Sequence, residues 1–189
     1  MRDAVRGVEA PAVPDPSAAS ADATPPAAGS LTADDLYARA EHALRAGDRT
    51  RAEQLWRELL ASYPRASKAP HARYDLAHLI QRRDPHGARA LLAELATATA
   101  PAALREPAAY LACRLHINAR EVDAAVRCFT EFRAVHPGSP HDAEVLAWLA
   151  GRAEESGGCA SARELAAEYV KRYPRGAFAS RATRCAEAP

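Results

Sequence analysis

Four stretches of the chain decide its fold: AEQLWRELLASYP (52–64), ARALLAELATATAP (88–101), AVRCFTEFRAVHP (125–137) and ARELAAEYVKRYP (162–174). Each begins with an alanine and ends with a proline. The closing prolines, Pro64, Pro101, Pro137 and Pro174, are 37, 36 and 37 residues apart. A repeat of roughly 20 to 50 residues is typical of solenoids and repeat arrays. We therefore expect an array of similar units.

Apolar residues follow each alanine at helical spacing, four and seven positions later: Trp56 and Leu59, Leu92 and Leu95, Phe129 and Phe132, Ala166 and Tyr169. This pattern predicts one buried stripe on a helix. A second stripe lies upstream in every unit: Leu36, Ala40 and Ala43; Leu76, Ala77 and Ile80; Ala109, Cys113 and His116; Leu146, Ala150 and Ala153. Each unit is therefore predicted to be a helical hairpin that its proline closes.

Two helix starts carry capping patterns. Thr50 and Glu53 have the spacing of a capping box, and Ser139 followed by Pro140 predicts a serine N-cap with proline at the first helical position. We expect helices to begin at these two places.

The units resemble tetratricopeptide repeats, through Ala40, Gly47, Ala52, Trp56 and Pro64 in the first and Ala150, Gly157, Ala162 and Pro174 in the fourth. The resemblance implies an all-α, right-handed superhelical stack of about four hairpins with a C-terminal capping helix. The expected units are 32–65, 66–101, 102–138 and 139–174, with the cap at 175–189. The joints SYPRASKAPHARYDLA, VHPGSPHDAEVLAWLA and RYPRGAFASRA resemble those of bacterial cell-envelope repeat proteins, such as outer-membrane assembly lipoproteins and Tol-Pal coordinator proteins.

The amino-acid composition divides the chain into two predicted regions. Residues 1–30, rich in alanine, proline and serine, are predicted to be a disordered tail or linker, and residues 31–189 the repeat domain. The tail has no continuous apolar core of a signal peptide, which favours the cytoplasm, whereas the joints favour the periplasm or cell envelope. No apolar stretch approaches the roughly 18 residues that span a bilayer, so we expect no direct membrane insertion.

Charge and motifs exclude several functions. A net charge of +1 does not favour nucleic-acid binding. Nucleophile-elbow, phosphate-loop and zinc-protease motifs are missing from the sequence, so we expect no enzyme, no catalytic residues and no cofactor. The cysteines are scattered, and His136 and His141 lie in a proline-rich joint, so no metal site is expected.

The resemblance places recurring positions of each first helix on a concave groove. The mapped residues are Tyr37, Glu41, Leu44, Tyr74, His78, Gln81, Tyr110, Arg114 and Ile117. Their three tyrosines either fill the seam between helices or contact a protein or peptide partner. Leu36 and Tyr37 lie on a first hairpin without a cap, which favours self-association through that hairpin.

Two disulfides are geometrically possible, Cys113 with Cys128 and Cys159 with Cys185, because each pair falls on neighbouring antiparallel helices. The alternative for Cys113 is a buried thiol. Disulfides favour an oxidising compartment, and free thiols favour the cytosol.

The sequence thus favours a non-catalytic scaffold that binds a peptide or protein through its groove, in a bacterial envelope complex. The alternatives are a cytosolic regulatory or signalling adaptor and an accessory subunit of an enzyme complex.

Overall fold

The computed structural model describes residues 31–97 and 99–188, and that part of the chain contains helices and no strand. The predicted tail, 1–30, lies outside it. The elements are α1 (Ala33–Arg45), α2 (Arg49–Ser62), α3 (Ala69–Ile80), α4 (Pro85–Ala93), the 3₁₀ turn η1 (Glu94–Ala96), α5 (Ala102–Asn118), α6 (Val122–Val135), α7 (Asp142–Arg172) and α8 (Ala179–Ala186).

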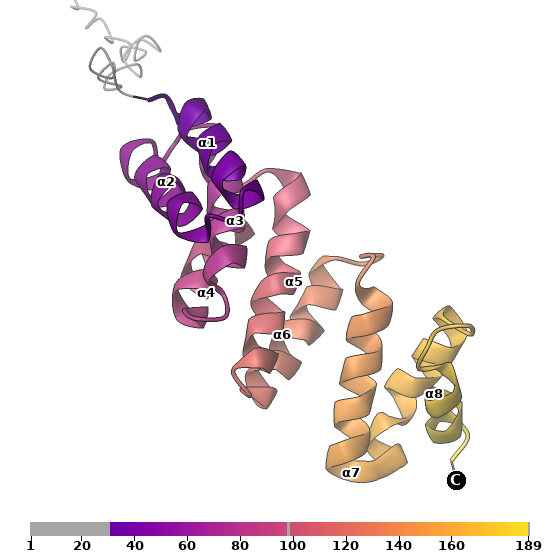
Figure 1. The fold of residues 1–189 in the computed structure, drawn as a ribbon. Coiled ribbons are helices and arrows are strands. Elements are labelled where there is room, and N and C mark those ends of the chain that lie inside the picture. The colour runs from indigo at the N-terminus through magenta and orange to yellow at the C-terminus, as the bar shows by residue number, and fades with distance from the viewer. Residues whose placement is uncertain (1–30, 98, 189) are drawn as a thin grey trace, which may run out of the picture. The chain divides into compact units, whose positions relative to one another are not determined.

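The helices pair as hairpins in chain order: α1 with α2, α3 with α4, and α5 with α6 (Figure 1). The fourth hairpin is α7 itself, which reverses direction at Gly157 and Gly158. Gly158 has φ +67°, a left-handed conformation that glycine adopts at low cost. The final helix, α8, packs against α7. This is the predicted all-α stack of four hairpins followed by a C-terminal helix.

Small side chains lie where helices approach most closely. The repeated alanines of the second helices are at most 1% exposed: Ala52, Ala88, Ala125 and Ala162. The matching positions of the first helices are equally buried: Ala40, Ala77, Cys113 and Ala150. Trp56, Leu92 and Phe129 fill the space between them and are 1% exposed each. The residues that recur along the sequence therefore occupy equivalent positions in the core of successive hairpins.

Three of the joints share one geometry. Tyr63, His136 and Tyr173 cap the C-termini of α2, α6 and α7, and their backbone N–H groups donate to Leu59, Phe132 and Tyr169 carbonyls at 2.7, 2.9 and 2.7 Å. Each is followed by a proline, which disfavours the helical conformation of the residue before it. The prolines thus end the second helices, as predicted.

Both predicted caps are corrected by the structure. α2 begins after Asp48, whose Oδ1 accepts from the Arg51 N–H at 2.9 Å, so Thr50 lies inside the helix. α7 begins at Asp142, not at Pro140. Ser139 Oγ instead accepts from the His141 N–H at 3.0 Å and donates to Glu106 at 2.6 Å. Asp48, two residues before Thr50, is thus the N-cap of α2. At the start of α7, the turn that contains Pro140 precedes the helix instead of beginning it.

The second helix of unit two is shorter than its partners. α4 stops at Ala93, and Pro101 comes directly before α5 rather than closing a helix. Thr97 Oγ1 donates to the Glu94 carbonyl at 3.1 Å and shares a hydrogen bond with Thr99 at 2.9 Å. Such local bonds compete with helix extension, so the threonine-rich stretch leaves the helix early.

Candidate binding groove

Each tyrosine of the predicted groove contacts a histidine. Tyr37 and His71 meet edge to face with ring centroids 6.4 Å apart, and Tyr74 and His78 do so at 4.9 Å. Tyr110 and His141 are stacked in parallel at 3.7 Å. The tyrosines come from α1, α3 and α5, one from each of the first three hairpins, and the three Tyr–His pairs are named here the Tyr–His ladder.

The hydroxyl groups of the ladder are engaged. Tyr37 donates to Asp75 Oδ2 at 2.6 Å, which connects α1 with α3. His78 Nε2 lies 3.1 Å from the Tyr74 hydroxyl, and Arg114 Nη1 donates to the Tyr110 hydroxyl at 2.9 Å. Burial raises the pKa of all three tyrosines, and for Tyr37 the hydrogen bond to Asp75 adds to it. The hydroxyls therefore stay neutral and act as hydrogen-bonding groups at physiological pH.

A pocket of about 310 Å³ lies between α3 and α5. Five of the nine predicted groove residues line it: Tyr74, His78, Gln81, Tyr110 and Arg114. Tyr110 also packs against Phe129 and Phe132, with centroids 6.1 and 6.0 Å apart. This tyrosine therefore packs against the core and also lines the pocket.

The other four predicted groove residues do not line this pocket: Tyr37, Glu41, Leu44 and Ile117. Glu41 is near Asp75, whose pKa is raised by burial and further by the charge of Glu41. Leu44 is 38% exposed, and Ile117 packs against the core around Cys113 and Phe129. Leu36, expected on a free face, is 1% exposed and unavailable to a second copy.

Sequence analysis missed four residues of the pocket: Pro107, Leu111, Asn118 and His141. Asn118 lies seven residues after Leu111, so both residues belong to one face of α5. Helical spacing along that face could therefore have identified them from the sequence. His141 precedes α7 and belongs to the proline-rich joint, where no functional residue was expected. Its position depends on the turn at Ser139, which repeat register does not predict.

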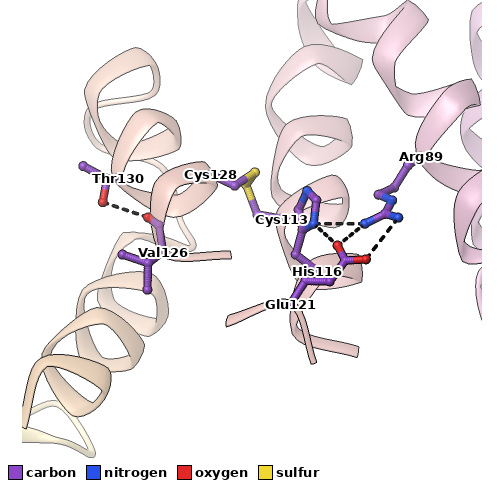
Figure 2. The surroundings of a disulfide bond; sticks show 7 residues. All are labelled: Arg89, Cys113, His116, Glu121, Val126, Cys128 and Thr130. Atoms are coloured by element: carbon purple, nitrogen blue, oxygen red, sulfur yellow. Dashed lines mark hydrogen bonds and ion pairs between the residues drawn. A yellow bond between two sulfur atoms is a disulfide. The ribbon is translucent and has the colours of Figure 1, made fainter. Parts of the chain in front are cut away.

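The Cys113 and Cys128 sulfurs are bonded and connect α5 with α6, with Cα atoms 5.4 Å apart (Figure 2). Next to them Arg89 of α4 reaches Glu121 at 2.5 Å, and His116 Nδ1 lies 2.6 Å from the same carboxylate. The hydrogen bonds from Arg89 and then His116 lower the pKa of Glu121 to about 2. This cluster joins the second hairpin to the third.

The second pair, Cys159 and Cys185, bonds α7 to α8 with Cα atoms 4.5 Å apart. Glu154 approaches the two sulfurs, so that the three could offer metal ligands, but its carboxylate pairs with Arg181 at 2.7 Å. Sulfurs in a disulfide are not thiolates, the form that binds metal ions. The arrangement therefore fits a covalent clasp of α8 better than a metal centre.

Comparison with known proteins identifies the fold. A tetratricopeptide repeat protein from Parabacteroides merdae ATCC 43184 superposes with a TM-score of 0.65 and 13% sequence identity, over 82% of this chain and 59% of that protein. This chain thus spans less than two thirds of that protein's length. No family model and no curated protein sequence matches the chain. The similarity shows that the fold is tetratricopeptide-like. None of the described helices is long and apolar enough to cross a bilayer.

Proposed function

We propose that this chain is a non-catalytic scaffold that binds a peptide or protein segment through the groove along α1, α3 and α5. The observation that carries the proposal is the pocket between α3 and α5, which Tyr74 and Tyr110 line beside Gln81 and Arg114. Tyrosine and arginine are the residue types that dominate protein recognition, because they combine broad apolar surface with directional hydrogen bonds.

The cysteine pairs favour an oxidising compartment for this scaffold. All four cysteines are paired, one pair within the third hairpin and the other between α7 and α8. Disulfides persist outside the cytosol and are rare inside it. We therefore place the scaffold in a bacterial cell envelope, as the joint sequences suggested, in preference to a cytosolic regulatory adaptor or an accessory enzyme subunit.

A peptide selection tests the proposal. A displayed library of random peptides is selected on the oxidised repeat domain, and the dissociation constants of enriched peptides are measured by fluorescence anisotropy. The groove variant is Tyr74→Ala with Arg114→Ala. The control is Arg127→Ala with Glu131→Ala on α6, where both side chains are exposed. Circular dichroism checks that each variant is folded.

We expect the groove variant to weaken binding at least about tenfold, since hot-spot truncations cost 2 kcal/mol or more. The control should bind as the unaltered domain does. Enriched peptides that bind the folded groove variant undiminished would contradict the proposal.

A further inference from the structure

We propose that the Cys113–Cys128 disulfide is a thiol-exchange site, at which the thiolate of a small thiol or of a dithiol oxidoreductase attacks the Cys128 sulfur. The site lies in a second pocket, which shares no lining residue with the pocket between α3 and α5. Thiol exchange and peptide binding can therefore be tested separately. The Cys159–Cys185 disulfide keeps a structural role.

Both cysteines of the third hairpin line an open pocket of about 560 Å³ between α5 and α6, named here the disulfide pocket. Ala96 lines it from η1, the turn that follows the shortened α4. α4 has 9 residues, whereas α2 and α6 have 14 each. On the α5 side the lining includes three small residues, Ala102, Ala109 and Ala112. The disulfide pocket thus lies beside the early end of α4, and it gives an incoming thiol access to the disulfide.

The two cysteines differ in exposure, which gives the attack a direction. Cys113 is 1% exposed, whereas Cys128 is partly exposed. Thiol exchange begins when a thiolate attacks one disulfide sulfur, and its rate depends on access to that sulfur. The incoming thiolate therefore forms a new S–S bond with Cys128 Sγ. The bond between Cys128 and Cys113 breaks, and its electron pair leaves on Cys113 Sγ, which takes up a proton.

A second thiolate completes the exchange. It comes from another small thiol or from the second cysteine of the dithiol, and it attacks the carrier's sulfur in the mixed disulfide. Cys128 Sγ leaves with the electron pair of that bond and takes up a proton. In total, two carrier thiols are oxidised to one disulfide, and the Cys113–Cys128 disulfide is reduced to two thiols.

The charged groups around the disulfide pocket limit which thiols suit it. Arg105 and His136 line the pocket together with Glu106 and Glu131. The Glu106 carboxylate accepts a hydrogen bond from Ser139 Oγ at 2.6 Å. With a neutral imidazole, two carboxylates face one guanidinium, so an acidic carrier is repelled. The attacking thiol is therefore better carried by an uncharged or basic molecule.

The Cys159–Cys185 disulfide is less open to attack. Cys185 is 2% exposed, and a carboxylate oxygen of Glu154 lies within 4.8 Å of both sulfurs. Arg181 holds this carboxylate at 2.7 Å. A bonded ion pair beside the sulfurs leaves less room for an attacking thiolate. The two disulfides should therefore differ in their rates of reduction.

The third hairpin can stay folded when its disulfide is reduced. Cys113 occupies the small-residue position of α5 and packs against Phe129 and Phe132. A free cysteine behaves as a small apolar residue in such a position. Reduction therefore yields two thiols in a folded chain, from which the disulfide can form again.

Reduction kinetics of the oxidised full chain under native conditions test the site. Two uncharged peptides supply the thiols, acetyl-Cys-Gly-Pro-Cys-amide as the dithiol and acetyl-Cys-Gly-Pro-Ser-amide as the single thiol. Samples are quenched with acid and alkylated, and mass spectrometry of proteolytic fragments measures each cysteine and each mixed disulfide. Ala112→Leu narrows the disulfide pocket, and Ala134→Leu, on an exposed position of α6, is its control. Circular dichroism checks that both variants are folded.

We expect Cys113 and Cys128 to be reduced at least about tenfold faster than Cys159 and Cys185, because access limits the rate. The single-thiol peptide should leave its adduct on Cys128. Ala112→Leu should slow the reaction at least about threefold, and Ala134→Leu should not change it. Faster reduction by the dithiol, at equal thiol concentration, supports the site and favours an oxidoreductase as the source of the thiolate, whereas equal rates support it and favour small thiols.

Three results would contradict the proposal. Equal reduction rates of the two disulfides would mean that reduction follows unfolding of the whole chain, and would overturn the site. An adduct on Cys113 instead of Cys128 would overturn the direction of attack. Undiminished reduction in the folded Ala112→Leu variant would overturn the disulfide pocket as the route of the thiol.

Discussion

Arg133 and Asp142 are bonded across the joint between the third and fourth hairpins: Arg133 Nε donates to Asp142 Oδ1 at 2.9 Å. The carboxylate is 2% exposed, accepts from the Tyr173 hydroxyl at 2.6 Å and forms an ion pair with Arg172 at 2.9 Å. Arg133 in turn reaches Glu168 at 2.5 Å. One buried carboxylate thus holds α6, the start of α7 and the end of α7 together.

Removal of this carboxylate should destabilise the fourth hairpin. Asp142→Ala leaves a half-buried guanidinium and a phenol without their acceptor, and breaking such a buried pair costs about 3 kcal/mol. Chemical denaturation measures the free energy of unfolding. Asp123→Ala, on an exposed position of α6, is the control and should change it by less than about 0.5 kcal/mol. Equal stabilities of the two variants would contradict the structural role of Asp142.

The same residue predicts a pH dependence. Burial alone would raise the pKa of Asp142, but the hydrogen bonds from Tyr173 and Arg133 outweigh it and lower that pKa. A lowered pKa in the folded state means that the stabilisation is present above the unfolded value, near pH 4, and is lost as the pH falls through the folded value. Melting temperatures between pH 7 and pH 2 should therefore decrease less in Asp142→Asn than in the unaltered chain. Parallel curves would show that the carboxylate is not linked to folding.

Arg120 lies in the turn between α5 and α6 and has a left-handed conformation, with φ +60°. In the corresponding turn of the first hairpin stands Gly47, with φ +84°. In that conformation a side chain costs roughly 1 to 2 kcal/mol relative to glycine. Arg120→Gly should therefore stabilise the chain by about 1 kcal/mol, and Gly47→Ala should destabilise it by a similar amount. Both are read from thermal unfolding. A destabilised Arg120→Gly variant would mean that the exposed arginine makes a contact worth more than the backbone cost.

Gly151 in α7 and Gly176 in the turn between α7 and α8 should respond oppositely to alanine. A Cβ on Gly176 would overlap the Tyr169 ring, with Cζ 2.9 Å away, whereas a Cβ on Gly151 meets nothing within 4 Å. Gly176→Ala should cost about 1 to 3 kcal/mol by overpacking. Gly151→Ala, inside the helical part of α7, should stabilise by about 0.5 to 1 kcal/mol through helix propensity. Unfolding curves that rank the two variants the other way would contradict the packing around Tyr169.

The disulfides give a chemical prediction. The loops that they close have sequence separations of 15 and 26, for which loop entropy predicts about 3 kcal/mol each. Denatured, unreduced protein should show no free thiol, and reduction should lower the melting temperature. The double variant Cys159→Ser with Cys185→Ser lacks only the bond between α7 and α8. Its melting temperature should therefore lie between those of the oxidised and the fully reduced unaltered chain. Four free thiols in freshly isolated protein would exclude both bonds and the oxidising compartment.

The repeat and the hairpins could be predicted because the alanines, aromatic residues and prolines are governed by local periodicity, and periodicity is what a sequence displays. Ala52 and Phe129 are buried for the reason that their spacing suggests. The start of α2 was missed because Asp48 and Thr50 are both good caps, and only the backbone path decides between them. The early end of α4 reflects hydrogen bonds of Thr97 and Thr99 that compete with the helix.

The candidate groove was predictable in part. Tyr74, His78 and Arg114 follow from the resemblance to the repeat family, which assigns recurring positions of each first helix to the concave face. His141 and the Asp142 network do not, because they depend on how the turn at Ser139 aims the start of α7 toward the preceding hairpin. The apolar stripe of one helix does not predict which residues of different hairpins will contact one another, because such contacts depend on how the hairpins pack.

Site-specific photocrosslinking of the natural partner tests most directly whether the groove is the binding surface. A photoreactive benzoylphenylalanine replaces Gln81 in the pocket or, as the matched control, Glu131 on the exposed face of α6. The protein is irradiated in the cells that produce it, and adducts are identified by mass spectrometry. We predict an adduct to one protein segment from position 81 that Arg114→Ala abolishes, and none from position 131. The same adduct from position 131, with position 81 silent, would contradict the groove.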